Sequence, residues 1–205
     1  MPTITVERPS FRLNCDAAHE ERAESIADLV DALEASKRGV VAGVTVQVGW
    51  SMLKLVKHGR RLVLCEPDFS GDPFTSFRPD ISTTLDVLAR QSARIAELGC
   101  EPIDFRYDDK IVFKNGCLSG DKLFATRSEP TKGDSGWYIA AVDDDDDDPQ
   151  QDNEAEGLEA MFAYELLDTK PHLLDVLTLP VRWVVLFDES AVTQIINHDD
   201  KIVWP

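Results

Sequence analysis

Cysteine is scarce in this sequence, and the four residues are far apart. Cys15, Cys65, Cys100 and Cys117 form no Cys-x-x-Cys pair, and none has a histidine at the spacing of a zinc ligand. Four scattered cysteines in a chain of 205 residues are expected to be free thiols in a reducing compartment. The sequence also lacks a phosphate-binding glycine loop. We therefore expect no metal site and no cofactor.

Long apolar runs are also missing. The most apolar stretch, residues 39–53, is interrupted by Thr45, Gln47 and Ser51. It is shorter than the roughly 20 apolar residues that cross a bilayer. The first residues lack the basic start and apolar run of a signal peptide. These observations predict a cytoplasmic protein that is not embedded in a membrane.

Basic residues are few, and the imbalance is concentrated at one end. The chain has 21 basic and 38 acidic residues, which gives a formal net charge of −17. Residues 143–205 hold 17 of the acids but only three bases, Lys170, Arg182 and Lys201. Such a field repels nucleic acid and anionic membranes and attracts a cationic protein surface. We therefore expect a basic protein partner, and the sequence leaves homo-oligomerisation open.

Hydrophobic periodicity predicts an α+β fold. Amphipathic helices are expected at residues 18–36, 81–98 and 154–167, and a short one ends near residue 177. Strands are expected at residues 44–50, 61–65 and 182–187, with hairpins formed by residues 103–107 with 110–113 and 122–127 with 136–142. Without a regular βαβ alternation, this order favours antiparallel strands and hairpins with amphipathic helices packed on one face. Two subdomains are expected, residues 1–114 and residues 115–205.

A Gly-Asp-Ser-Gly sequence around Ser135 is the first candidate for chemistry. In trypsin-like proteases a serine in this setting is the nucleophile, but here Trp137 stands where a further glycine is usual. His19 lies too close to the N-terminus for barrel strands to precede it. A nucleophilic serine also needs an oriented base within reach. We therefore expect a structural turn, in which Gly136 supplies backbone freedom and Asp134 caps local amides.

The six consecutive aspartates are the second candidate. Read as a calcium loop that begins at Asp143, the run places Asp148 where a glycine is required and Pro149 directly after it. A specific calcium site is therefore not expected. The carboxylates are instead candidates for contact with a basic partner, together with two glutamates that follow. The candidate partner-binding residues are Asp143, Asp144, Asp145, Asp146, Asp147, Asp148, Glu154 and Glu156.

Three short sequences resemble a known family. They are Gly116-Cys117-Leu118-Ser119, then Ala125-Thr126-Arg127-Ser128-Glu129-Pro130, then Asp134-Ser135-Gly136-Trp137-Tyr138-Ile139. Together they resemble the Imm33-like immunity proteins of bacterial polymorphic toxin systems, over roughly residues 115–187. In that family a strand that ends in an arginine and an acid is followed by a polar turn and by Asp-Ser-Gly-Trp. The structural motif would then be Arg127, Asp134, Ser135, Gly136 and Trp137. The uninterrupted aspartate run and the long N-terminal part depart from the family pattern.

The resemblance implies a non-enzymatic antidote that binds and neutralises a cognate toxin. The charge distribution agrees, because a nuclease toxin presents basic residues to phosphates and an acidic surface can occlude them. Two alternatives remain: a serine hydrolase that uses Ser135, and an acidic interaction module without a toxin partner. Two further expectations concern single residues. Trp137 is expected to be a packing residue, and Arg127 and Asp134 are expected to form an ion pair across the turn.

Overall fold

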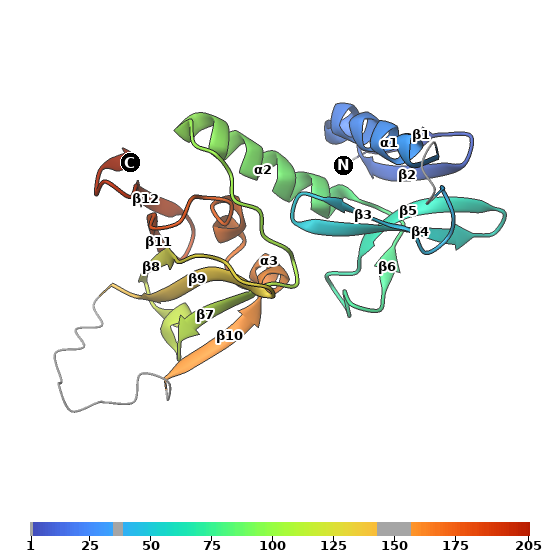
Figure 1. The fold of residues 1–205 in the computed structure, drawn as a ribbon. Coiled ribbons are helices and arrows are strands. Elements are labelled where there is room, and N and C mark those ends of the chain that lie inside the picture. The colour runs from blue at the N-terminus through green and yellow to red at the C-terminus, as the bar shows by residue number, and fades with distance from the viewer. Residues whose placement is uncertain (1, 35–38, 143–156) are drawn as a thin grey trace. The chain divides into compact units, whose positions relative to one another are not determined.

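The computed structural model describes residues 2–34, 39–142 and 157–205, which form two compact units (Figure 1). The units are Met1–Arg90 and Gln91–Pro205, and the boundary falls inside helix α2 (Ser82–Leu98). Each unit contains one mixed β-sheet with helical segments packed against it. The expected α+β class is therefore confirmed.

The first unit is built on a sheet with one parallel pair. Strands β2 and β5 run parallel, and the other neighbours are antiparallel. In spatial order the strands are β1 (Thr3–Glu7), β2 (Phe11–Asp16), β5 (Arg61–Pro67), β4 (Ser51–His58) and β3 (Thr45–Val48), and β6 (Phe77–Arg78) pairs with β5.

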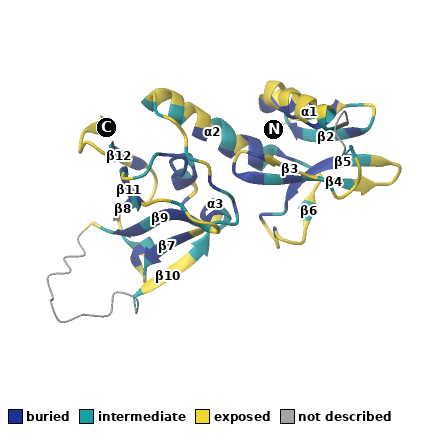
Figure 2. Cartoon of the chain, viewed as in Figure 1, coloured by how far each residue is buried: buried dark blue, intermediate teal, exposed yellow. Residues whose placement is uncertain are grey.

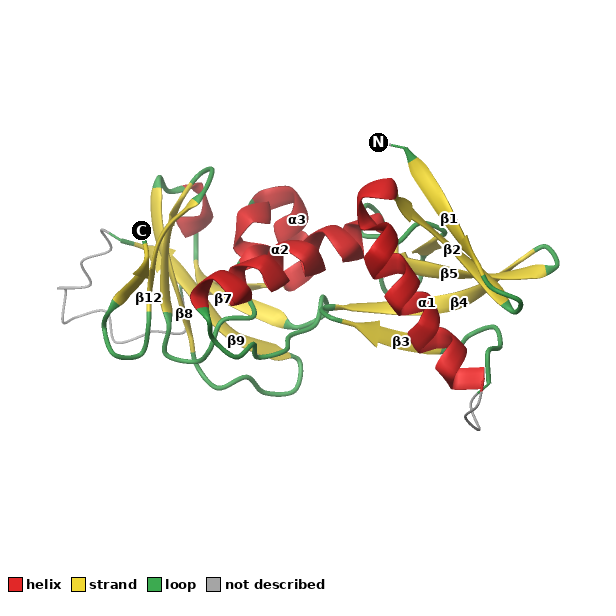
Figure 3. Cartoon of the chain, turned by 90° about the horizontal axis from the view of Figure 1, so that it is seen from above, coloured by secondary structure: helices red, strands yellow, loops and turns green. Residues whose placement is uncertain are grey.

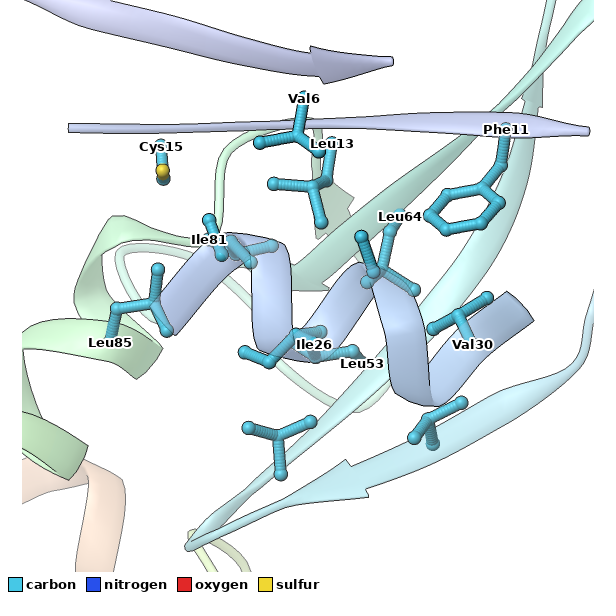
Figure 4. Close-up of a cluster of buried hydrophobic side chains, with 14 of the residues drawn as sticks. Val6, Phe11, Leu13, Cys15, Ile26, Val30, Leu53, Leu64, Ile81 and Leu85 are labelled. Carbon is cyan, nitrogen blue, oxygen red and sulfur yellow. The ribbon is translucent and has the colours of Figure 1, made fainter. Parts of the chain in front are cut away.

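Helix α1 (Glu20–Glu34) provides the other half of this unit's core (Figure 3). It follows the 3-10 turn η1 (Ala17–His19), whose first turn is capped by the Asp16 carboxylate. Ile26 and Val30 on α1 are buried against side chains of the sheet, as Figure 4 shows. Ile81 and Leu85, at the start of α2, belong to the same buried cluster. The apolar stripe of α1 at positions separated by three and four residues is therefore what packs on the sheet.

The second unit has a seven-stranded sheet in which only the β7–β9 pair is parallel. Its spatial order is β10 (Leu158–Phe162), β7 (Lys110–Lys114), β9 (Asp134–Ala141), β8 (Lys122–Arg127), β11 (Val184–Asp188), β12 (Val192–Ile196) and β13 (Ile202–Trp204).

One face of this second sheet is the buried core, because buried and half-buried residues alternate along β7, β8 and β11. The core face carries Ile111, Trp137 and Phe187. Short helical segments supply the buried leucines that complete this core, and Gln91 of α2 donates a 2.9 Å hydrogen bond to the carbonyl of Leu174. These segments are η3 (Ala163–Glu165), α3 (Leu166–Thr169) and η4 (Pro171–Asp175).

Several expected elements are confirmed. The helix expected at residues 18–36 is η1 followed by α1, and the helix expected at residues 81–98 is α2. The hairpin expected from residues 122–127 and 136–142 is the antiparallel pair β8–β9. The strand expected at residues 182–187 is β11.

Other expected elements are wrong. Residues 157–167, the described part of the helix expected over residues 154–167, do not form one helix. Residues 158–162 instead pair with β7 as strand β10, and helical backbone begins only at Ala163. Residues 103–107 form no strand, because the Ile103 N–H bonds to the Thr178 carbonyl. The strand expected at residues 44–50 is confirmed as β3, whereas β4, which follows it directly, was not expected.

The sequence-based boundary before residue 115 lies one strand later than the boundary between the units. Strand β7 ends at Lys114, and it lies inside the second unit's sheet between β10 and β9. The second unit therefore starts at Gln91 and includes β7.

Candidate functional site

The turn between β8 and β9 accepts only glycine at one position. The Ser128 N–H donates to the Gly136 carbonyl at 2.8 Å, and the Asp134 carboxylate accepts a 2.8 Å bond from the Gly136 N–H. Gly136 has φ +76°, and a Cβ at this position would lie 2.3 Å from the Ser128 carbonyl oxygen. Both the backbone angle and the close approach therefore require glycine.

Ser135 is fully buried and its hydroxyl is occupied by main-chain groups. The hydroxyl donates to the Lys110 carbonyl at 2.7 Å and accepts a 3.3 Å bond from the Trp137 N–H. A nucleophilic serine must instead give its proton to a base. Ser135 therefore links β9 to β7, and this geometry does not favour the hydrolase alternative.

Arg127 is the centre of the second unit's polar core. Its side chain is 1% exposed, and within the described ranges its guanidinium donates only to main-chain carbonyls. A planar guanidinium can serve several acceptors at once, which an ammonium group does less well. The acceptors are the carbonyls of Leu179 at 2.6 Å, Ser135 at 3.1 Å, Ile103 at 3.2 Å and Asp104 at 3.3 Å.

Burial sets the acidity of this arginine. Removal from water lowers the pKa of Arg127 to about 10, and the negative charges of Asp109 and Glu129 oppose that shift. The group stays cationic at neutral pH. In the part of the chain that the structure describes, no ion pair joins Arg127 to Asp134, whose carboxylate instead caps Gly136. The expected Arg127–Asp134 ion pair is therefore wrong, because the guanidinium of Arg127 bonds to four main-chain carbonyls instead.

Trp137 lies beside Arg127 on the same face of the sheet. It is 1% exposed, its indole N–H donates to the Leu177 carbonyl at 3.0 Å, and the guanidinium carbon of Arg127 is 5.7 Å from the ring centroid. Side-chain hydrogen bonds from Trp137 on β9 and Arg127 on β8 thus connect these two strands to the main chain of residues 177–179. Side chains buried in this way are not available for contact with another molecule.

The candidate partner-binding residues, Asp143–Asp148, Glu154 and Glu156, lie outside the described residues. The structure does describe the two positions that flank them. The Val142 N–H donates to the Lys122 carbonyl at 3.1 Å, and the Gly157 carbonyl accepts from Asn115 at 2.6 Å. The acidic segment therefore joins the end of β9 to the start of β10, which are separated in the sheet by β7.

The face of the second sheet opposite its core carries apolar side chains. The pairing register places Val112 beside Tyr138, and Thr126 beside both Tyr138 and Val184. The Phe124 and Tyr138 rings form an edge-to-face pair with centroids 6.3 Å apart. These side chains are half-buried. A partly exposed apolar face of this kind is a common feature of protein interfaces.

The possible metal ligands and the cysteine thiols were the remaining candidates for chemistry. Among residues 2–34, 39–142 and 157–205, no group of three or more histidine, cysteine, aspartate or glutamate side chains could hold a metal ion. The four cysteines are free thiols, and burial raises the pKa of Cys15 and of Cys65 to about 11. Those two thiols are therefore protonated, poor nucleophiles at neutral pH.

Within the described ranges, no helix has the length and apolar character needed to cross a membrane.

Glu66 is a titratable residue that the sequence reasoning missed. Its carboxylate is fully buried in the first unit and accepts a 2.8 Å bond from the Thr84 N–H near the start of α2. Burial raises the pKa of Glu66 to about 7. An acidic residue directly after the apolar run of residues 62–65 was the available signal, because buried carboxylates are rare unless they are paired.

Comparison with known proteins identifies one family. The model of the Imm33-like domain matches residues 90–198, which is more than half of the chain and covers nearly the whole second unit. No curated protein and no solved structure matches the chain. The matched range contains Arg127, Ser135 and Trp137, whose side chains hold the second unit together. The chain therefore belongs to the Imm33-like family, a family of immunity type.

Proposed function

We propose that this chain is an immunity protein that binds a cognate bacterial toxin and neutralises it without catalysis. The observation that carries the proposal is the Imm33-like match over residues 90–198. An immunity-type protein has a toxin as its partner in general. The buried Ser135 hydroxyl, bonded to the Lys110 carbonyl, supports action by binding over hydrolysis.

The charge of the matched region supports a basic partner. Residues 143–205 contain 17 acidic and three basic residues, and nine of these acids fall between residues 143 and 156 with no base among them. Opposite charges steer two proteins together and raise the association rate. In this proposal Asp143–Asp148, Glu154 and Glu156 meet cationic side chains of the toxin.

A nuclease is the toxin class that best fits this charge. Nucleases bind phosphates through lysine and arginine side chains, so their active surface is basic. A dense set of carboxylates competes for those side chains and occludes the surface. The Arg127, Asp134, Ser135, Gly136 and Trp137 motif would serve this function indirectly, since it holds the sheet that carries the acidic segment.

Co-expression tests the proposal directly. The protein encoded beside this chain is produced in a bacterial host with and without it, and growth is measured. We expect the neighbour alone to stop growth and the pair to grow. With purified proteins, inhibition of nucleic-acid cleavage should reach its endpoint at equimolar inhibitor.

The endpoint separates the alternatives. Inactivation of the toxin by far less than one equivalent of the chain would indicate an enzyme and overturn the binding proposal. A neighbour that is harmless, or that is not bound, would favour an acidic interaction module without a toxin partner.

A further inference from the structure

Strand β10 is an edge of the second sheet, and most of it is open to solvent. It pairs with β7 on one side and has no strand on the other in the described part of the chain. Most of β10 is coloured as exposed in Figure 2. Leu158, Glu159 and Ala160 are all exposed, and Leu158 retains 45% of its surface. Its free side is therefore accessible along these three residues.

The hydrogen-bond ladder shows which residues of β10 have unused main-chain groups. Asn115 donates to the Gly157 carbonyl, and Ala163 donates to the Asp109 carbonyl. In an antiparallel pair the bonded residues alternate. The main-chain groups that bond toward β7 are therefore those of residues 157, 159, 161 and 163. The N–H and C=O groups that point away from the sheet are those of residues 158, 160 and 162.

Two of these three residues keep free donors. The Phe162 N–H is bound by the Glu165 carboxylate at 2.6 Å. Among the described residues, nothing accepts a bond from the N–H groups of Leu158 and Ala160. Exposed edge donors of this kind are a template for a further strand.

The side chains of β10 do little to block such pairing. Proteins usually protect edge strands with lysine, proline or a bulge, and β10 contains none of these. Leu158 and Ala160 lie on the same face as Val112, and Glu159 lies on the other face. A pairing strand would therefore meet apolar side chains on one face and a carboxylate on the other.

We propose that β10 is a docking strand, to which the partner adds an extended, positively charged segment. The proposal deepens the proposed function and rests on it for the partner's identity as a toxin. The occupant follows from charge: Glu159 is exposed on β10, and the 14 residues before Gly157 include nine acids and no base. A second copy of this chain would bring two such acidic segments together, which disfavours self-pairing.

The first test uses a short peptide in which valine and lysine alternate, with the full-length chain and amide hydrogen exchange read by NMR. The valines suit the face of Leu158 and Ala160, and the lysines suit Glu159. We expect the peptide to protect the Leu158 and Ala160 amides, and added salt to weaken this protection. The same peptide with glutamate in place of lysine should give no protection. Unprotected amides at saturating lysine peptide would overturn the proposal.

The main-chain contact is tested by Ala160→Pro, with Ala160→Thr as the matched control. Proline removes an N–H that bonds to no other residue in the described part of the chain, so the fold should persist. We expect Ala160→Pro to weaken peptide binding at least about tenfold, which is about 1.4 kcal/mol, and Ala160→Thr to bind as the parent chain does. Glu159→Lys leaves the main chain intact and should also weaken binding. Equal binding by Ala160→Pro and the parent chain would contradict the proposal.

Two further measurements distinguish partner docking at β10 from self-association and from failure of the proposed function. We expect sedimentation equilibrium to show that the parent chain is no dimer held together through β10. A dimer of the parent chain that Ala160→Pro converts to monomer would identify a second copy as the occupant and overturn the proposal. In the co-expression assay, full protection by Ala160→Pro would remove β10 from the interface and leave the proposed function standing. Failure of the parent chain to protect would instead count against the proposed function.

Discussion

Gly133 and Gly136 have the same left-handed backbone but different surroundings. Their φ angles are +80° and +76°, yet a Cβ at Gly133 has no atom within 4 Å, whereas one at Gly136 meets the Ser128 carbonyl oxygen. Gly133→Ala should cost only the backbone strain, about 1 kcal/mol. Gly136→Ala must also displace main chain, so we expect a loss at least about 2 kcal/mol larger. Urea unfolding of the two variants measures the difference, and equal midpoints would contradict it.

Trp137 contributes both packing and one hydrogen bond. Truncation by Trp137→Ala should lower the free energy of unfolding by about 3–5 kcal/mol. Trp137→Phe keeps most of the apolar surface but leaves the Leu177 carbonyl without its donor, which costs about 1–3 kcal/mol. Trp204→Phe is the control, because Trp204 is only half-buried and donates to the exposed Glu97. Calorimetry of all three variants should rank them in that order, and an unchanged melting temperature for Trp137→Ala would rule out the packing role.

Glu66 should make the stability of the first unit depend on pH. Its pKa is raised from 4.5 to about 7 by burial, against opposing bonds from Thr84 and the Arg78 guanidinium at 3.9 Å. A raised pKa means that the folded state binds the proton more tightly than the unfolded state does. The resulting stability is fully present below about pH 4.5 and is lost as the pH rises through about 7.

The variant Glu66→Gln tests this dependence, because glutamine keeps an acceptor for the Thr84 N–H and carries no charge. We expect the variant to be more stable than the parent chain at pH 8 and to show a smaller change between pH 5 and pH 8. Glu159→Gln, which alters an exposed carboxylate, should behave as the parent chain does. A carbon-13 NMR titration that places the Glu66 pKa near 4.5 would exclude the effect.

At the scale of elements, the hydrophobic pattern of the sequence correctly predicted those helices and strands that depend on contacts between neighbouring residues. The apolar stripe of residues 18–36 and the alternation of residues 122–127 act through neighbours in sequence, and α1, β8 and β9 formed as expected. Leu158, Met161 and Phe162 have helical spacing, yet they lie in β10 because the edge of β7 offers main-chain partners. Such a tertiary partner overrides a local preference.

The candidate site shows the same division. The glycine turn and the packing role of Trp137 follow from residue type and neighbouring sequence. The acceptors of Arg127 do not, because Ile103 and Leu179 are distant in sequence and become neighbours only through the fold. The parallel β7–β9 pair is equally non-local, and no single-sequence pattern indicates it.

Helix α1 is held to the β1–β2 turn by one arginine. Arg8 forms ion pairs with Glu24 at 2.7 Å and with Asp28 and Asp31 at 2.8 Å. These carboxylates raise the pKa of Arg8 above its ordinary value. Arg8→Gln should leave the helix formed but opening more often, because three like charges then face one another. Faster amide exchange confined to α1 is the expected result, and Arg61→Gln, which removes the outer ion pair with Glu7, should change α1 less.

At the scale of the whole molecule, Asp143–Asp148 account for six of the 38 acidic residues behind the net charge of −17. Replacing Asp143–Asp148 with asparagine takes the formal charge from −17 to −11. We expect slower association with a basic partner, most of all at low salt, where the Debye length is about 30 Å at 0.01 M. The dissociation rate should change less.

Replacing the same six residues with glutamate is the matched control, since it keeps the charge at −17 and should keep the association rate. Stopped-flow kinetics with the purified toxin at two salt concentrations compares the variants. Equal rates and equal salt slopes for the asparagine variant and the parent chain would assign the attraction to other acids, such as Glu156 and Glu159.

The main-chain bonds on either side of residues 143–156 bear on how this protein can diverge. Main-chain bonds at Val142 and Gly157 fix both flanks of the segment, whichever side chains lie between them. We therefore expect substitutions of these acids to leave intact the strand register that Gly136, Arg127 and Trp137 maintain. Under the proposed function, we expect related chains with different toxins to differ in these acids while they keep the same sheet.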